Sequence, residues 1–230
     1  MRFLALLKKE LREAVPWIIL SVILLFIISW FLIRMMAVYR GAEFYYGMLP
    51  SGKVIEQYLI FRTDILQGPA VLMFFISIGL GLVLGFRHFW MPGFTGTWQF
   101  LIHRSVTRPA IISAKLAAAA ILMFCLSLAW LLIAGIAGKS ERTIIPPESG
   151  LVGLGIFYAY LGFIVYMGTA LCAITKARWY TTRMFGLFFV FIMFMAILPQ
   201  KSFANAFIIT VVFFAVLIVQ IYEIFLQREF

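Results

Sequence analysis

Side chains able to contact a partner gather in one stretch, GTWQFLIHRSVTRPAIISAKL, which covers residues 96–116 between two long apolar segments. If Gly96 or Thr97 caps a short helix here, Trp98, Leu101 and Ile102 share one face at spacings of three and four residues. Such a helix would present an apolar protrusion to a groove on a soluble partner. The alternative is that the basic residues reflect only the excess of Lys and Arg in cytoplasmic loops.

The sequence offers little for catalysis. Its only histidines, His88 and His103, lie in one connector, and we interpret them as interfacial polar residues rather than metal ligands. There is no HExxH motif and no Gly-rich loop ending in GK[ST]. We therefore expect no catalytic, cofactor-binding or metal-binding residues in this chain. Cys125 and Cys172 fall within apolar segments, where a small buried hydrophobic residue is the favoured interpretation.

The composition indicates an integral membrane protein. Hydrophobic residues make up 64% of the chain and charged residues 12%, whereas about 25% charged residues is usual for soluble proteins. The net charge of +10 is then better explained by membrane topology than by nucleic-acid binding.

We predict an all-α polytopic membrane protein, with residues 1–230 forming one transmembrane domain. A spanning helix needs about 20 apolar residues. Six segments meet or approach this length: 17–38, 66–86, 116–138, 150–175, 184–200 and 203–222. The fifth is the shortest, and a tight turn or shallow re-entry at residues 198–202 should separate it from the sixth.

The distribution of basic residues predicts that both termini are cytoplasmic. This orientation places twelve of the 19 Lys and Arg residues inside and seven outside. Residues 39–65 then form an external loop, and residues 87–115 form a cytoplasmic connector. We expect a multi-pass protein of the cell membrane, either an inner or a plasma membrane, in contact with its lipids.

An amphipathic segment precedes the first predicted span. In residues 1–16, the side chains Phe3, Leu4, Leu7 and Leu11 share one helical face, and charged side chains occupy the other. We predict an interfacial elbow helix that Pro16 separates from the first span; the alternative is a solvated helical tail. Apart from Arg34 near a boundary, the predicted spans lack ionisable Asp, Glu, Lys, Arg and His, which disfavours a proton-coupled carrier.

Small residues predict where helices approach closely. Gly81 and Gly85 lie four residues apart in the second predicted span, and Gly153 and Gly162 belong to a glycine-rich fourth span. Contacts within one chain and contacts between two chains explain these glycines equally well.

The predicted elbow, the six spans and the connector between the second and third spans together resemble the type-2 ABC transporter permeases. The connector in that family has the form G-T-x-E-x-L-x-x-x-[PS]-V-[ST]-R, followed by a lysine at the start of the third span. This sequence matches the form at Gly96, Thr97, Leu101, Ser105, Val106, Thr107, Arg108 and Lys115. It departs from the form at Gln99, where the family has an acidic residue, which puts a salt bridge at that position in doubt. The last external loop is also shorter than the re-entrant helices of many members.

The resemblance implies that the connector is a coupling helix that docks on a separate ATPase. The docking residues would be Thr97, Trp98, Gln99, Leu101, Ile102, Arg104, Ser105 and Val106. Two permease chains, identical or different, would pair above two ATPase subunits, which would bind ATP and Mg. Because many members are exporters, we expect an exporter; the sequence does not specify its substrate.

Two other functions remain open. The chain could be a non-transporting assembly or sensory subunit that docks a cytoplasmic partner. It could also be a membrane-embedded enzyme that uses groups supplied by a substrate or cofactor.

Overall fold

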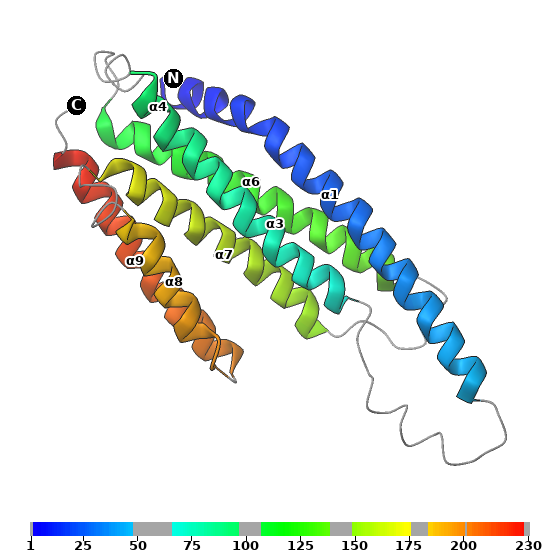
Figure 1. The fold of residues 1–230 in the computed structure, drawn as a ribbon. Coiled ribbons are helices and arrows are strands. Elements are labelled where there is room, and N and C mark those ends of the chain that lie inside the picture. Colours follow the sequence, from blue (N-terminus) through cyan, green and yellow to red (C-terminus); the bar gives the residue numbers. More distant parts are fainter. Residues whose placement is uncertain are drawn as a thin grey trace.

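The computed structural model describes residues 2–47, 66–96, 107–138, 149–175, 184–200 and 202–227, and the regular elements in these ranges are all helical. Figure 1 shows the helices side by side in an elongated bundle. They are α1 (Arg2–Gly47), α3 (Gln67–Gly85), the π-helix η1 (Phe86–Trp90), α4 (Met91–Phe94), α6 (Arg108–Gly138), α7 (Ser149–Ile174), α8 (Phe185–Ile197) and α9 (Phe203–Gln227).

Five helices in the described residues are long and apolar enough to cross a membrane: α1, the continuous α3–η1–α4 unit, α6, α7 and α9. The shortest of them has 25 residues, which at about 1.5 Å per residue exceeds the roughly 30 Å hydrocarbon thickness. The predicted fifth span, 184–200, contains the 13-residue helix α8. At the same rise, α8 is too short to cross a flat bilayer on its own.

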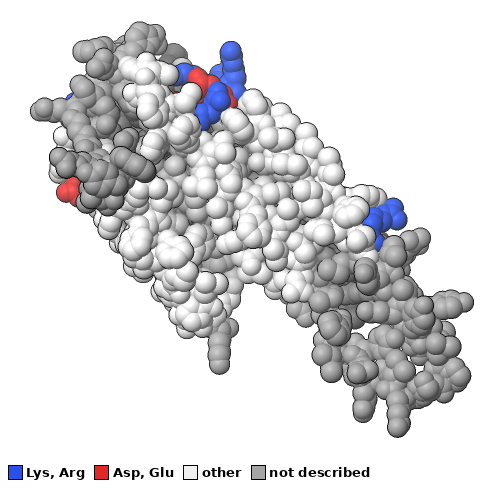
Figure 2. Space-filling view, in the orientation of Figure 1, with Lys and Arg blue, Asp and Glu red and all other residues white. Residues whose placement is uncertain are grey.

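The surface is typical of a membrane protein. Figure 2 shows one face on which the described charged residues lie toward the ends, with a broad middle that carries none. Large apolar side chains are exposed along α1, α6 and α9, including Ile27, Phe124 and Val219. Water disfavours apolar surface of this extent, so these side chains are suited to contact with lipid. Cys125 is exposed on α6, whereas Cys172 is buried in α7.

Helix α1 is a single helix of 46 residues with Pro16 inside it. The sequence predicted an elbow helix that is separate from the first span and a loop that begins at residue 39. The structure instead continues the helix through both positions, and Figure 1 shows that its N-terminal part bends. A proline removes one backbone hydrogen bond and kinks a helix, but neighbouring turns that remain paired can carry the helix past it.

Helix α7 occupies the centre of the bundle. It packs against α3, α6, α8, α9 and η1, and every residue from Ile164 to Ile174 is buried. Near its start, Trp130 Nε1 in α6 donates a hydrogen bond to Val152 O at 3.0 Å. Near its end, α7 meets α8 where Gly168 and Gly186 face each other. Because α7 packs against most of the other helices, a shift of any one of these neighbours would change its contacts with α7.

The most extensive helix contact joins α3 and α7. A Cβ added at Gly81 would overlap Gly162 O, and one added at Gly162 would lie 2.5 Å from Ser77 O. A Cβ at Gly85 would lie 2.6 Å from Thr169 Cβ. These three glycines therefore allow the two backbones to approach closely. Gly153, which the sequence grouped with them, lies away from this contact, with no atom within 4 Å of an added Cβ.

Candidate functional site: a buried polar cluster

Four polar side chains from four helical elements meet inside the bundle. They are Glu10 of α1, His88 of η1, Lys115 of α6 and Tyr166 of α7, and we call them the polar cluster. All four are buried, and the relative exposure of the three ionisable groups Glu10, His88 and Lys115 is only 2%, 1% and 2%. An ionisable group inside a membrane protein is expensive to bury and usually has a function or a partner.

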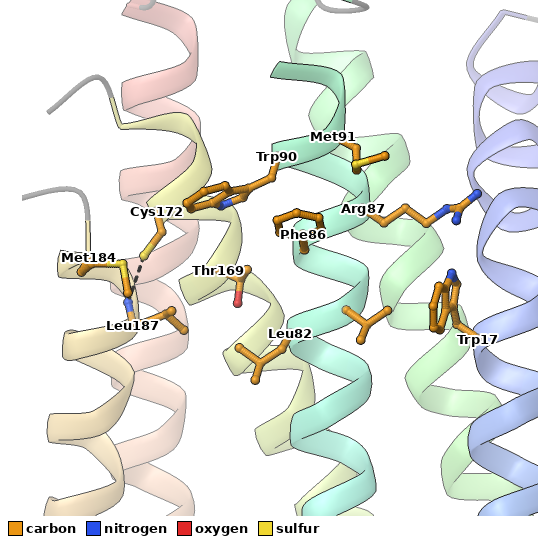
Figure 3. Close-up of a pocket in the computed structure, with 11 residues that line it drawn as sticks. Trp17, Leu82, Phe86, Arg87, Trp90, Met91, Thr169, Cys172, Met184 and Leu187 are labelled. Carbon is orange, nitrogen blue, oxygen red and sulfur yellow. Dashed lines mark hydrogen bonds between the residues drawn. The ribbon is translucent and has the colours of Figure 1, made fainter. Parts of the chain in front are cut away.

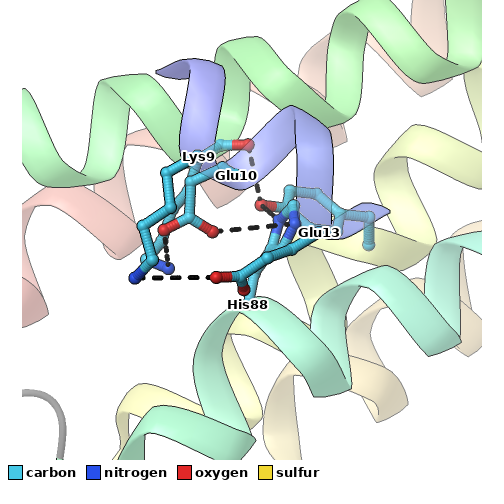
Figure 4. A network of polar contacts seen from close by, with 6 residues as sticks. Lys9, Glu10, Glu13 and His88 are labelled. Atoms are coloured by element: carbon cyan, nitrogen blue, oxygen red, sulfur yellow. Dashed lines mark hydrogen bonds and ion pairs between the residues drawn. The ribbon is translucent and has the colours of Figure 1, made fainter. Parts of the chain in front are cut away.

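The carboxylate of Glu10 lies between the other two ionisable groups. Lys115 Nζ donates a hydrogen bond to Glu10 Oε1 at 2.8 Å. On the other side, Glu10 Oε2 lies 3.8 Å from His88 Nε2. Figure 4 shows His88 reaching from α3–η1 toward the carboxylate on α1. One acidic side chain of α1 thus contacts groups on η1 and α6.

Tyr166 connects the same groups from the side of α7. Its hydroxyl donates a hydrogen bond to the backbone oxygen of Lys115 at 3.0 Å, and it lies 3.1 Å from His88 Nδ1. Since the hydroxyl proton points to Lys115 O, the hydrogen bond to His88 requires that Nδ1–H donates to the hydroxyl oxygen. The polar cluster therefore ties α1, η1, α6 and α7 together through side chains.

The π-helix η1 is the local feature that carries His88. A π turn accommodates one additional residue in a helix and so changes which side chains face the bundle. His88 and Phe89 of η1 are buried, whereas the rings of Phe86 and Trp90 stack at 5.7 Å on the outer side. Single π turns occur often at functional sites.

A second ion pair lies beside the polar cluster but in contact with solvent. Lys9 Nζ and Glu13 Oε1 are 3.8 Å apart on consecutive turns of α1, and their side chains are 46% and 42% exposed. Exposed pairs of this kind contribute little to stability. Glu10 is therefore unlike Lys9 and Glu13, because its side chain is buried and contacts other helices.

The polar cluster joins the two ends of the connector, residues 87–115. His88 lies at its start and Lys115 at its end, so Glu10 contacts the helical elements at both ends. A further contact comes from α9, because Arg108 Nη1 donates a hydrogen bond to Leu226 O at 3.1 Å. These contacts define the connector end of the bundle, where α1 begins, α6 begins and α9 ends (Figure 1).

The predicted docking residues of the connector lie outside the described residues. They are Thr97, Trp98, Gln99, Leu101, Ile102, Arg104, Ser105 and Val106, and His103 lies among them. The structure describes the chain up to Gly96, whose φ of +67° suits glycine, and again from Thr107. Most of the predicted external loop, residues 48–65, also lies outside the described ranges.

The predicted elbow residues are only partly turned toward the protein. Phe3 and Leu4 are exposed, and Leu7 and Leu11 are half-buried. The side chains buried against the bundle are instead Leu6, Glu10 and Ala14. The amphipathic pattern predicted that every charged side chain of this segment lies on the outer face, whereas Glu10 lies on the inner one.

The polar cluster was missed by the sequence analysis, although one signal was available. Leu6, Glu10, Ala14 and Ile18 are spaced by four residues, so a continuous helix aligns them on one face. Leu6, Glu10 and Ala14 already align within the predicted elbow helix, and only Ile18 requires the helix to continue through Pro16. Nothing in the sequence pairs Glu10 with Lys115, which lies 105 positions away.

The chemistry of the polar cluster favours structural coupling over catalysis. It contains a carboxylate hydrogen-bonded to an ammonium group and an imidazole hydrogen-bonded to a phenol, all closed off from solvent. Within the described residues, no group of three or more His, Cys, Asp or Glu side chains could hold a metal ion. The cluster can hold the helices around the connector in a fixed relative position.

Comparison of the chain with models of protein families, with curated proteins and with solved structures gave no match in any of the three.

Proposed function

We propose that this chain is the membrane-spanning permease subunit of an ATP-driven ABC transporter, working as an exporter. In this proposal the connector, with Trp98 and Leu101 at its centre, docks on a separate ATPase subunit. The chain itself hydrolyses nothing; the ATPase binds ATP and Mg. Two permease chains, identical or different, form the substrate route, and two ATPase subunits bind beneath them at the connector end.

One observation carries the proposal: Glu10 contacts both His88 at the start of the connector and Lys115 at its end. A docking segment transmits force to the whole bundle when the helices at its two ends are connected and move together. The ion pair and the Tyr166 hydrogen bonds supply that connection, and they extend it to α1 and α7. Densely packed helices of this kind respond to a push as rigid bodies.

The proposed cycle follows from this connection. Closure of the ATPase subunits on ATP would displace the connector, and α1, α3, α6 and α7 would tilt as a group. The connector end must then face the compartment that contains ATP. This requirement places both termini in the cytoplasm and the protein in an inner or plasma membrane. With both termini on one side, the chain must cross the membrane an even number of times. In this proposal α8 therefore serves as the fifth span, in a locally thinned bilayer, and α9 as the sixth.

The test is to purify the chain from native membranes in mild detergent and to measure ATPase activity in the eluate. The variants are the wild type, Trp98→Ala/Leu101→Ala in the connector, and Leu198→Ala as the control. Leu198 is a large exposed apolar residue in the turn between α8 and α9, away from the connector. We expect the wild type and Leu198→Ala to retain an ATPase and the connector variant to lose it.

Two results would contradict the proposal. If no ATPase accompanies the wild type, the chain does not couple to one, and an enzyme activity of the isolated chain should then be assayed. If a cytoplasmic partner without ATPase activity is lost from the connector variant, the chain is a docking subunit for assembly or sensing.

A further inference from the structure

A groove of about 570 Å³ opens on the outer surface of the bundle between α1 and α8. Figure 3 shows α3 and η1 between its walls, with Trp17 on the side of α1 and Leu187 on the side of α8. Leu82 and Phe86, which belong to the floor, are exposed. The volume falls within the roughly 300–1,000 Å³ of typical ligand pockets, and the lining is mostly apolar.

Among the described residues that line the groove, Arg87 is the only charged one. Its Nε atom is buried and has no hydrogen-bond partner in the part of the chain that the structure describes. The two described carboxylates near the start of α1 have other partners, because Glu10 pairs with Lys115 and Glu13 with Lys9. A buried N–H donor without a partner is costly, and the side chain is charged, so an anionic ligand in the groove would be complementary to it.

The groove also has a polar end and an apolar end. Figure 3 shows Arg87 and Met91 nearer the connector end and Leu82 nearer the middle of the bundle, with Trp17 beside the Arg87 side chain. Tryptophan rings are enriched at the depth of lipid headgroups, and Trp17 and Trp90 both line this groove. A ligand with an anionic head and an apolar tail would therefore match the groove when its head points toward the connector end.

We propose that this groove binds one anionic phospholipid of the surrounding bilayer. The phosphate accepts hydrogen bonds from the Arg87 guanidinium group, whose planar geometry suits phosphate oxygens. One acyl chain lies along Leu82 between Trp17 and Leu187. Basic pockets between transmembrane helices bind anionic headgroups in other membrane proteins. This proposal requires the membrane location of the bundle but no ATPase partner, so it can fail or succeed independently of the proposed function.

The experiment is a lipid titration of the purified full-length chain by native mass spectrometry, with phosphatidylglycerol and phosphatidylcholine as probes. The variants are Arg87→Gln and Arg87→Lys, and Arg34→Gln is the matched control. Arg34 also lies next to a tryptophan, 4.7 Å from the centre of the Trp30 ring, but outside the groove. Circular dichroism and gel filtration check that each variant is folded.

We expect the wild type to retain one phosphatidylglycerol molecule more tightly than phosphatidylcholine. Arg87→Gln should weaken phosphatidylglycerol binding about tenfold, the loss expected for a hydrogen-bonded charge pair, with little effect on phosphatidylcholine. Arg87→Lys should retain part of the preference, because it keeps the charge but not the paired donors. Arg34→Gln should bind both lipids as the wild type does.

A second variant keeps the test decisive if Arg87→Gln does not fold. Leu82→Trp adds bulk to the floor of the groove without removing the charge, and it should also weaken phosphatidylglycerol binding. Equal lipid binding by the wild type and all groove variants would overturn the proposal. So would a wild-type dimer that Leu82→Trp converts to a monomer with no dependence on lipid, because a second copy of the chain would then be the occupant.

Discussion

Glu10 Oε1 and Lys115 Nζ lie 2.8 Å apart, although 105 positions separate the two residues in the chain. Both side chains are buried, so their contact is shielded from water and from salt. The pair joins the start of α1 to the start of α6, at the opposite end of the connector from His88. This one contact therefore links the N-terminal segment to the helix in which the connector ends.

Breaking this pair from one side should be costly. We expect Lys115→Met to lower the free energy of unfolding by about 3–5 kcal/mol, because Glu10 then stays buried without its partner. The double variant Glu10→Leu/Lys115→Met should recover most of the loss. Unfolding in mixed micelles with SDS, followed by circular dichroism, measures both.

The exposed pair on the same helix is the control for that measurement. Lys9 and Glu13 are nearly half exposed, so we expect Glu13→Gln to change the stability by less than about 1 kcal/mol. If Glu13→Gln and Lys115→Met lowered the free energy of unfolding equally, burial would not be the reason for the stability that the Glu10–Lys115 pair contributes.

Removal of the Tyr166 hydroxyl should also destabilise the protein. Tyr166→Phe keeps the ring but deprives His88 Nδ1 of its partner and removes the bond to Lys115 O. We expect a loss of about 1–3 kcal/mol in the same unfolding assay, as for other buried polar groups left unpaired.

Tyr158→Phe is the matched control on α7. The Tyr158 ring packs edge-on against Phe74 at 5.1 Å, and its hydroxyl makes no hydrogen bond with the described residues. It should therefore change the stability by no more than about 0.5 kcal/mol. A loss as large as that of Tyr166→Phe would contradict the assigned role of the Tyr166 hydroxyl.

The α3–α7 contact predicts opposite outcomes for two glycines of α3. Gly81→Ala should destabilise the protein by about 1–3 kcal/mol, because the new methyl group overlaps the backbone of Gly162. Gly79→Ala adds its methyl group where nothing lies within 4 Å, and we expect a change within about 0.5 kcal/mol. Thermal unfolding of both variants in the same detergent tests the difference; equal melting temperatures would argue against this helix contact.

The two ends of α9 should lie on opposite sides of the membrane. Helix α9 has 25 residues, long enough to cross, and its last turns lie beside the start of α6 through the Arg108–Leu226 hydrogen bond. In a variant without Cys125 and Cys172, a membrane-impermeant thiol reagent should label Ser202→Cys and Thr107→Cys from opposite sides. Labelling of both from one side would mean that α9 does not span the membrane.

The bulk of the architecture follows from the sequence because lipid imposes a simple requirement on length and polarity. A helix satisfies its own backbone hydrogen bonds, so a run of about 20 apolar residues predicts a spanning helix without reference to any other segment. This reasoning located the segments that became α1, α3, α6, α7 and α9. It left the segment that contains α8 uncertain, because its apolar run is short.

Predictions from single residues were less reliable where the same residue type is compatible with several local structures. Pro16 predicted a separate elbow helix, but a proline can kink a helix as well as end it, and α1 continues to Gly47. The glycines of the fourth predicted span looked alike in sequence. Only Gly162 lies at the α3–α7 contact, whereas Gly153 is open, because the crossing point depends on how the two helices are oriented.

The sequence alone determined that this is a helical membrane protein and singled out the connector, since composition and apolar length are properties of each segment. Only the tertiary structure revealed the polar cluster and the Arg87 groove. The contacts of Glu10 with Lys115 and His88 join residues far apart in the chain, and a charged residue near the end of an apolar run looks the same whether it faces water or another helix. The partners of these buried charged residues are determined by how α1, α3, α6 and α7 pack around one another, and no local sequence pattern encodes this packing.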